Sequence, residues 1–180
     1  MTCDVTKPES IAEAVKQIEQ ETEHVDILIN NAGITGPIHY DLLWAQSIQE
    51  VQSILQRQWG DWDDTWRTNT SSIVAVSAAL LHLLDKANEK RGWVTGRRQQ
   101  QHKISGDLTD RRTSQIITVT SVAAFNRQIT GGLAYAATKS GAVMVGKIMA
   151  TFLAPFGIRS NIIAPGSKCR CSDIRRGCSD

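Results

Sequence analysis

The sequence predicts a doubly wound α/β fold built on a parallel sheet. Two observations support this fold class. Three short, β-prone and almost continuously apolar runs occur at 25–29, 115–120 and 158–163, a composition typical of strands in parallel sheets that helices cover on both faces. Long segments with apolar residues at helical spacing separate these runs. Strands that alternate with helices in this way indicate parallel strands joined by helical crossovers.

Composition indicates a single globular domain. The chain has 180 residues, of which 41% are hydrophobic and 21% charged, with a formal net charge of +2, a charge too small to indicate a nucleic acid or a membrane surface as partner. The longest strongly apolar stretch, 73–84, is too short to span a bilayer. No signal segment is recognised at the start, so we expect a cytoplasmic protein without a membrane helix.

The first elements are a helix, a strand and a polar turn. Thr6 and Glu9 have the spacing of a capping box, and Pro8 suits the first turn of the helix that follows. The apolar residues of this helix fall on one face: Ile11, Ala14, Val15 and Ile18. The run 25–29 then stops at Asn30-Asn31-Ala32-Gly33, which indicates a buried strand ending in a turn.

The remaining elements continue the alternation of helices and strands. Residues 34–62 are expected to form a loop with a short helix near 48–56, followed by a long helix from Asp63 to about Lys90. The strand 115–120 precedes a glycine-containing loop and a helix over 133–153. The last strand, 158–163, lies between Gly157 and Pro165-Gly166.

The ends of these strands predict where a ligand binds. In doubly wound sheets, ligands lie beyond the carboxyl ends of the strands. Asn31, Ser121 and Pro165-Gly166 each follow a strand. We therefore expect these residues to share one crevice.

Two segments fall outside the pattern. Residues 91–112 are polar and basic and are expected to form a surface insertion; Trp93 is their only aromatic residue, which disfavours a nucleic-acid site. Residues 167–180 are expected to be an unstructured tail. The tail holds Cys169, Cys171 and Cys178, which lack the fourth ligand and paired spacing of a zinc site, so no metal site is predicted.

Tyr135 and Lys139 lie four positions apart on a predicted helix and therefore share a face. Phenols have a pKa near 10 and are poor acids or bases at neutral pH. A positive charge at about 4 Å stabilises a phenolate by roughly 4 kcal/mol at an effective dielectric constant near 20. The pair can therefore form a proton shuttle, although an isolated pair of this kind is more often an ordinary exposed one.

Two further polar residues join this pair. Ser121, after a strand, could hold a carbonyl or alcohol oxygen, or simply form a turn. Asn69 lies inside a predicted helix, where its amide could bind a water, kink the helix or point to solvent.

This ordered set resembles the short-chain dehydrogenase/reductase family over residues 3–166. The matching pieces are Asp4-Val5, Asn30-Asn31-Ala32-Gly33, Asn69, Ser121, Tyr135-Ala136-Ala137-Thr138-Lys139 and Asn161-Ile162-Ile163-Ala164-Pro165-Gly166. The resemblance implies a Rossmann-like domain over 1–166. The sequence around Ser121 and Tyr135 is similar to that of fungal members, many of which modify secondary metabolites.

The resemblance implies an oxidoreductase that uses NADP or NAD and interconverts a carbonyl and a secondary alcohol. Tyr135 would be the general acid/base, Lys139 would favour its phenolate and hold the nicotinamide ribose, Ser121 would orient the reacting oxygen, and Asn69 would support a proton-relay water. The residues implied to border the cofactor are Asp4, at the adenine, and Asn31, Ala32, Gly33, Tyr135, Lys139, Pro165 and Gly166.

The sequence departs from the family pattern at both ends. The first βαβ unit, with its glycine-rich phosphate-binding turn, has no counterpart, and the segment after Gly166 is short and polar. Thr120 is an alternative to Ser121, because the loop to Tyr135 is one residue longer than usual. Because the phosphate-binding turn has no counterpart, a non-catalytic remnant that only binds other subunits is the second hypothesis. In either case the helices 63–90 and 133–153 are implied to form a homo-oligomer.

Overall fold

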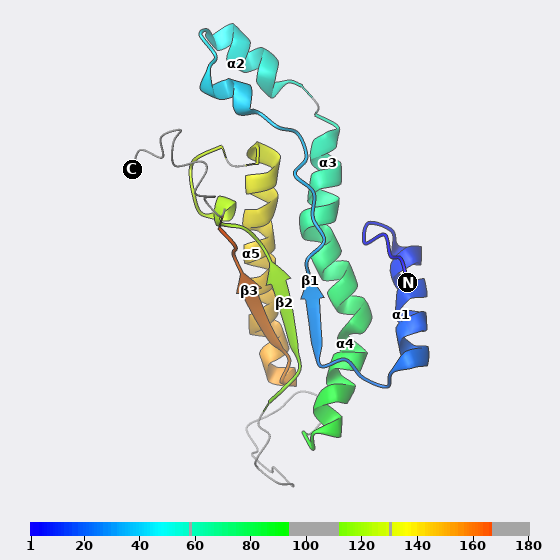
Figure 1. The fold of residues 1–180 in the computed structure, drawn as a ribbon. Helices are drawn as coiled ribbons and strands as arrows, with labels where there is room; N and C mark the ends of the chain where they lie inside the picture. Colours follow the sequence, from blue (N-terminus) through cyan, green and yellow to red (C-terminus); the bar gives the residue numbers. More distant parts are fainter. Residues whose placement is uncertain (58, 94–111, 130, 167–180) are drawn as a thin grey trace, which may run out of the picture.

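A computed structural model describes residues 1–57, 59–93, 112–129 and 131–166 (Figure 1). Most of the predicted insertion 91–112 and all of the predicted tail 167–180 lie outside these ranges. The expectations for these two segments, including the three cysteines of the tail, therefore remain predictions.

Three parallel strands form the sheet in the part of the chain that the structure describes. They are β1 (Ile27–Asn30), β2 (Gln115–Val119) and β3 (Arg159–Ile163), in the order β1-β2-β3. In the register, Ile29 lies opposite Ile117, and Ile117 lies opposite Asn161. The predicted strands and their parallel arrangement are confirmed, and the sheet is incomplete, as the missing first βαβ unit implies.

Helices connect the strands. The α-helices are α1 (Pro8–Glu21), α2 (Ile48–Leu55), α3 (Asp61–Trp66), α4 (Ser72–Lys90) and α5 (Leu133–Leu153). Short 3-10 turns are η1 (Tyr40–Leu43), η3 (Val122–Ala124) and η4 (Ala154–Phe156). The predicted bounds of α5 are confirmed residue for residue.

The predicted capping box of α1 is wrong. Lys7 is the N-cap residue, and no side chain caps the helix there. The hydroxyl of Thr6 instead donates to Asp4 Oδ1 at 2.7 Å, and the Thr6 N–H donates to the same oxygen at 3.0 Å. Because Asp4 organises a local turn, the Thr6 side chain is unavailable to the helix. Pro8 occupies the first helical position, as expected.

The long helix before β2 contains an irregular turn. Helices α3 and α4 are joined through a π-helical segment, η2 (Arg67–Ser71). The combined helix Asp61–Lys90 is long and apolar enough to cross a membrane by length and composition alone. It packs against α1, β1 and α5, however, as a core helix of a globular domain does.

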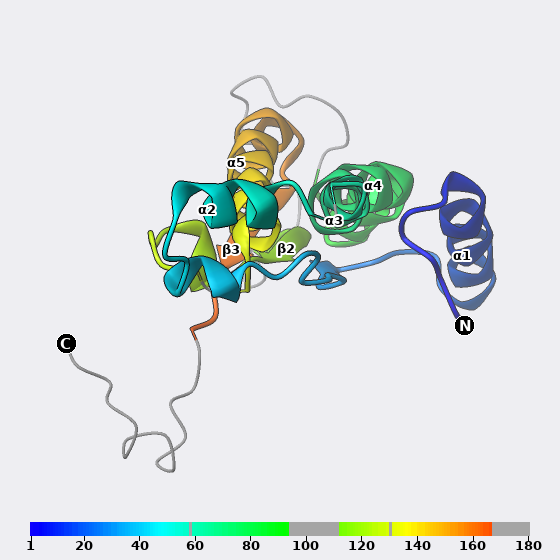
Figure 2. The ribbon, with the colours of Figure 1, turned by 90° about the horizontal axis from the view of Figure 1, so that it is seen from above.

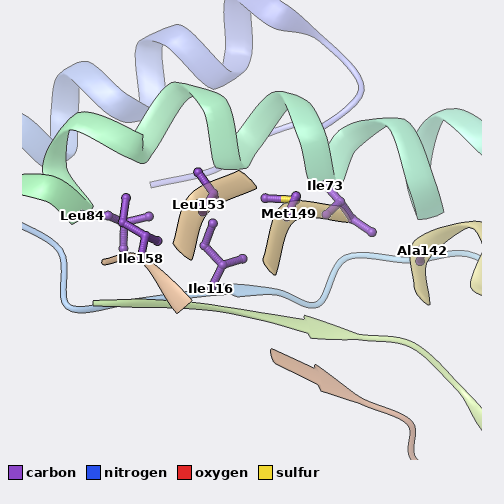
Figure 3. Packing of buried hydrophobic residues seen from close by; sticks show 7 residues of the cluster. All are labelled: Ile73, Leu84, Ile116, Ala142, Met149, Leu153 and Ile158. Carbon is purple, nitrogen blue, oxygen red and sulfur yellow. The ribbon is translucent and has the colours of Figure 1, made fainter. Parts of the chain in front are cut away.

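The hydrophobic core lies between the sheet and the helices α4 and α5. Figure 3 shows the side chains that meet there, from both helices, from β2 and from the residue before β3. They are Ile73, Leu84, Ile116, Ala142, Met149, Leu153 and Ile158. Leu84 and Ile116 have no exposed surface. Seen from above, α1 packs on the far side of α4 from α5 (Figure 2).

The opposite face of the sheet is bare within the described part of the chain (Figure 1). Side chains alternate along each strand, so Ile116 faces the helices whereas Ile117 faces away. Ile27, Ile29 and Ile163 share this open face and are 49%, 57% and 50% exposed. An incomplete doubly wound sheet has such a surface, because further helices normally cover it.

Candidate active site

The carboxyl ends of the three strands bring the predicted site loops to one edge. Parallel strands place the segments after Asn30, Val119 and Ile163 on the same side of the sheet. Two of these segments are hydrogen-bonded to each other, since the Val122 N–H donates to the Pro165 carbonyl oxygen at 3.0 Å. The expected neighbourhood of Ser121 and Pro165 is therefore present.

Tyr135 and Lys139 share one face of α5, as their spacing predicts. The ammonium nitrogen of Lys139 lies 5.8 Å from the centroid of the Tyr135 ring. Tyr135 is half-buried in the first turn of the helix. The backbone turn before it supports the ring closely, because a Cβ on Gly131 would lie 2.9 Å from Tyr135 Cδ1.

Lys139 is almost fully buried, with 4% of its surface exposed. Its Nζ donates to the carbonyl oxygen of Val119, the last residue of β2, at 3.0 Å. Burial lowers the pKa of the Lys139 ammonium, because removal from water disfavours its charged form. The lysine is thus aimed at the carboxyl edge of the sheet, with two of its three donors not used by this bond.

Gly33 fits closely against these groups. A Cβ at this position would lie 3.1 Å from Asn69 Oδ1 and 3.2 Å from Lys139 Nζ. The absence of a side chain therefore lets the turn after β1 approach both residues. Asn31 and Ala32 precede Gly33 and are exposed at the same edge.

Asn69 is buried, with 1% of its surface exposed, and does not point to solvent. Its Oδ1 accepts from the Ile34 N–H at 2.8 Å, and its Nδ2 donates to the Ile34 carbonyl oxygen at 2.8 Å. It lies in the π-helical turn η2, a feature that often marks functional sites in helices. The structure therefore shows an irregular helix at Asn69 and excludes the solvent-facing alternative, and the bound water stays a prediction.

Thr138 is a site residue that the sequence analysis missed. Its Oγ1 accepts from Asn69 Nδ2 at 3.0 Å and donates to the Tyr135 carbonyl oxygen at 3.0 Å. The neighbouring Thr70 donates to the Thr138 carbonyl oxygen at 2.8 Å. These bonds join η2 to the first turn of α5. The signal available in the sequence is the threonine directly before the lysine in Tyr135-Ala136-Ala137-Thr138-Lys139.

Ser121 and Thr120 differ in accessibility. Thr120 is 3% exposed, and its hydroxyl donates to the Ile163 carbonyl oxygen at 3.1 Å. Ser121 is half-buried, and its Oγ accepts from the Ala123 N–H at 3.1 Å. Since this bond leaves the hydroxyl proton of Ser121 for another acceptor, the geometry favours Ser121 over Thr120.

The other predicted cofactor residues are at the surface. Asp4 is exposed in the turn before α1, and its hydrogen bonds from Thr6 lower the pKa of its carboxyl group. Pro165 and Gly166 are exposed after β3, and a Cβ on Gly166 would lie 3.7 Å from Val122 Cγ1. The structure thus gathers Asn69, Lys139 and Gly33 closely, with Tyr135 one turn away, and leaves Asp4 in a separate segment.

The family profile of the short chain dehydrogenases matches residues 1–169. The chain belongs to the short-chain dehydrogenase/reductase family. It is 31% identical over 169 residues to the short-chain dehydrogenase/reductase VdtF of Byssochlamys spectabilis, covering 91% of this chain and 55% of VdtF. It is 33% identical over 166 residues to the 3-oxoacyl-[acyl-carrier-protein] reductase FabG of Vibrio cholerae, covering 92% of this chain and 52% of FabG.

This fold is shared with solved structures of other proteins. An NADH-dependent reductase, A1-R', complexed with NAD, superposes with a TM-score of 0.68 at 21% identity, covering 94% of this chain and 57% of that chain. This family member therefore spans about half the length of the relatives that it matches. The similarity extends over almost all of its own residues.

Proposed function

We propose that the protein acts as an NAD(P)-dependent oxidoreductase that interconverts a carbonyl and a secondary alcohol by hydride transfer. The observation that carries this proposal is the pairing of Tyr135 with the buried Lys139 on one face of α5, with Nζ bonded to the end of β2. A phenol next to a fixed ammonium group at the carboxyl edge of a parallel sheet suits proton transfer to a bound oxygen.

The residues divide the proton transfer among them. During reduction, the Tyr135 hydroxyl donates a proton to the carbonyl oxygen, and during oxidation its phenolate accepts the proton of the alcohol. The Ser121 hydroxyl donates a hydrogen bond to the same oxygen and orients it. The charge of Lys139 favours the phenolate, while Asn69 and Thr138 hold the turn after β1 against α5.

The described residues fit the nicotinamide end of the cofactor. Gly33 lets the turn after β1 pack beside Lys139 Nζ, which keeps the lysine at this edge. Asn31, Ala32, Pro165 and Gly166 border the same edge. These residues, with Tyr135, would hold the nicotinamide and its ribose, and Asp4 the adenine. When bound, NADP or NAD supplies or accepts the hydride. The glycine-rich turn that holds the pyrophosphate in the family has no counterpart in this sequence.

Cofactor titration tests the proposal. Addition of NADPH or NADH should enhance nicotinamide fluorescence, and no change at millimolar cofactor would leave only the non-catalytic remnant. Tyr135→Phe should abolish turnover and retain cofactor binding. Ser121→Ala should lower kcat by roughly 100-fold or more, whereas Ser53→Ala, at an exposed position on α2, should not.

The proposed biological role is secondary-metabolite biosynthesis. The resemblance around Ser121 and Tyr135 to fungal family members supports a role in secondary-metabolite biosynthesis. Screening ketones of that class with both cofactors would test this role. A cytoplasmic location stays a prediction.

A homo-oligomer through α4 and α5 is supported by their apolar outer faces. Val74, Ile148 and Phe152 are 50%, 54% and 50% exposed and line a cavity of about 280 Å³ between the two helices. Exposed apolar surface of this kind is typical of interfaces. Ile148→Glu should lower the mass measured by sedimentation equilibrium, whereas Gln20→Glu, exposed on α1, should not.

A further inference from the structure

A second apolar surface lies outside the residues assigned above, on the segment between β1 and α4. Helix α2, the start of α3 and the first residue of α5 together line a groove of about 780 Å³. Its apolar lining consists of Ile48, Val51, Leu55, Trp59, Trp62 and Leu133. This volume is within the range of small-molecule pockets, about 300–1000 Å³.

The lining chemistry indicates an uncharged, flat ligand. The Trp59 and Trp62 rings have their centroids 5.8 Å apart and are inclined by 41°. Trp59 and Ile48 are 71% and 72% exposed, so they present large apolar surfaces to an incoming molecule. The polar side chains among the described lining residues are the amides of Gln52 and Gln56. An indole pair with neutral hydrogen-bonding groups nearby favours aromatic rings bearing oxygen substituents.

The groove adjoins the first turn of α5, which also carries Tyr135. Leu133 lines it, and Tyr135 lies two residues further along the same first turn of α5. In the view onto the carboxyl ends of the strands, α2 is nearest the viewer and lies above α5 (Figure 2). Helix α2 therefore lies over the end of α5 that carries Tyr135.

Two contacts hold this segment against the turn before α5. The Gly131 N–H donates to the Tyr40 hydroxyl at 3.2 Å. Gly132 lies so close to the preceding segment that a Cβ there would be 2.4 Å from the Pro37 carbonyl oxygen. Gly131 in turn packs on the Tyr135 ring. The groove and the phenol are thus fixed relative to each other through the same short turn.

We propose that this groove binds an aromatic ring system of the substrate, so that the protein acts on uncharged aromatic ketones or the corresponding alcohols. The inference rests on the proposed oxidoreductase function, because that function identifies Tyr135 as the reacting end. A second copy of the chain or another protein on this groove is the competing occupant.

Binding of 2-acetonaphthone, an uncharged aromatic ketone, tests the groove without cofactor. It should quench the tryptophan fluorescence saturably. Val51→Asp, which puts a carboxylate in the lining, should raise Kd at least tenfold. Ser53→Asp is the matched control, because Ser53 is exposed on the same helix and lies outside the lining. Equal Kd values for the two variants, with unchanged circular dichroism, would overturn the proposal, as would concentration-dependent self-association lost only in Val51→Asp.

Turnover measurements separate this proposal from the proposed function. With NADPH, Val51→Asp should raise KM for 2-acetonaphthone, and Ser53→Asp should not. Tyr135→Phe should abolish turnover and retain saturable quenching. Saturable, Val51-dependent quenching without any turnover would support the groove and refute the oxidoreductase. Turnover of 3-methyl-2-butanone without saturable quenching by 2-acetonaphthone would support the oxidoreductase and refute the groove.

Discussion

The side-chain amide of Asn69 pairs with both backbone groups of Ile34, accepting from its N–H and donating to its carbonyl oxygen, each at 2.8 Å. This reciprocal pair ties the turn after β1 to the helix that follows it. The same amide also donates to Thr138 Oγ1 at 3.0 Å, so a single side chain joins three segments far apart in the sequence.

Asn69→Ala should reduce the free energy of unfolding by about 2–4 kcal/mol, because it leaves buried partners without hydrogen bonds. Urea denaturation followed by circular dichroism measures this change. Asn126→Ala, at an exposed loop position, should change stability by less than about 0.5 kcal/mol. Similar losses in both variants would show that the Ile34 pair contributes little.

Lys139 should make stability depend on alkaline pH. Since burial lowers its pKa in the folded protein, the unfolded chain retains the proton over a range in which the folded chain has lost it. Stability therefore rises with pH between the lowered value and the ordinary value of about 10.5. Lys139→Met should lack this rise, as urea titrations at several pH values would show. Lys147→Met, at an exposed site on α5, should retain it; parallel pH profiles for wild type and Lys139→Met would contradict the prediction.

Gly132→Ala should destabilise the turn before α5. Its φ angle of 94° is unfavourable for a side chain, and the new Cβ would meet the Pro37 carbonyl oxygen. We expect a loss of about 2 kcal/mol or more. The matched change is Gly60→Ala, at a φ of -64° with nothing within 4 Å, which should be neutral or stabilising by up to about 1 kcal/mol. Thermal unfolding of the two variants distinguishes these effects.

The open sheet face should promote self-association. Ile29→Thr, at a side chain 57% exposed on the edge strand β1, should reduce light scattering and dye binding at high protein concentration with little loss of stability. Ile116→Thr is the contrasting variant, because Ile116 is completely buried. It should lower the free energy of unfolding by roughly 2–4 kcal/mol. Unchanged scattering for Ile29→Thr would mean that this face is covered in solution.

Strand and helix positions were largely predictable because apolar periodicity determines them. The helix α5 and the strand β2 have clear apolar patterns bounded by glycine or polar residues, and the structure places them where the pattern predicts. The capping box failed for a local reason: Asp4 competes for the Thr6 hydroxyl. Short-range competition of this kind leaves no periodic signal in the sequence.

The candidate site was only partly predictable. Tyr135 and Lys139 could be placed together from helical spacing alone. The pairing of Asn69 with Ile34 and Thr138 depends on tertiary packing and on the π-helical turn, neither of which the apolar pattern indicates. The groove on α2 was missed, since its lining comes from α2, α3 and α5, and its members look like ordinary apolar residues in each helix.

The π-helical turn also constrains the length of the chain between α3 and α4. An ordinary α-helix advances by about 100° per residue, so the wider turn at Arg67–Ser71 sets the rotational offset between α3 and α4. Deleting one residue there would restore regular winding and remove the irregular turn from which Asn69 bonds to Ile34. The number of residues in this turn is therefore as important to the arrangement as their identity.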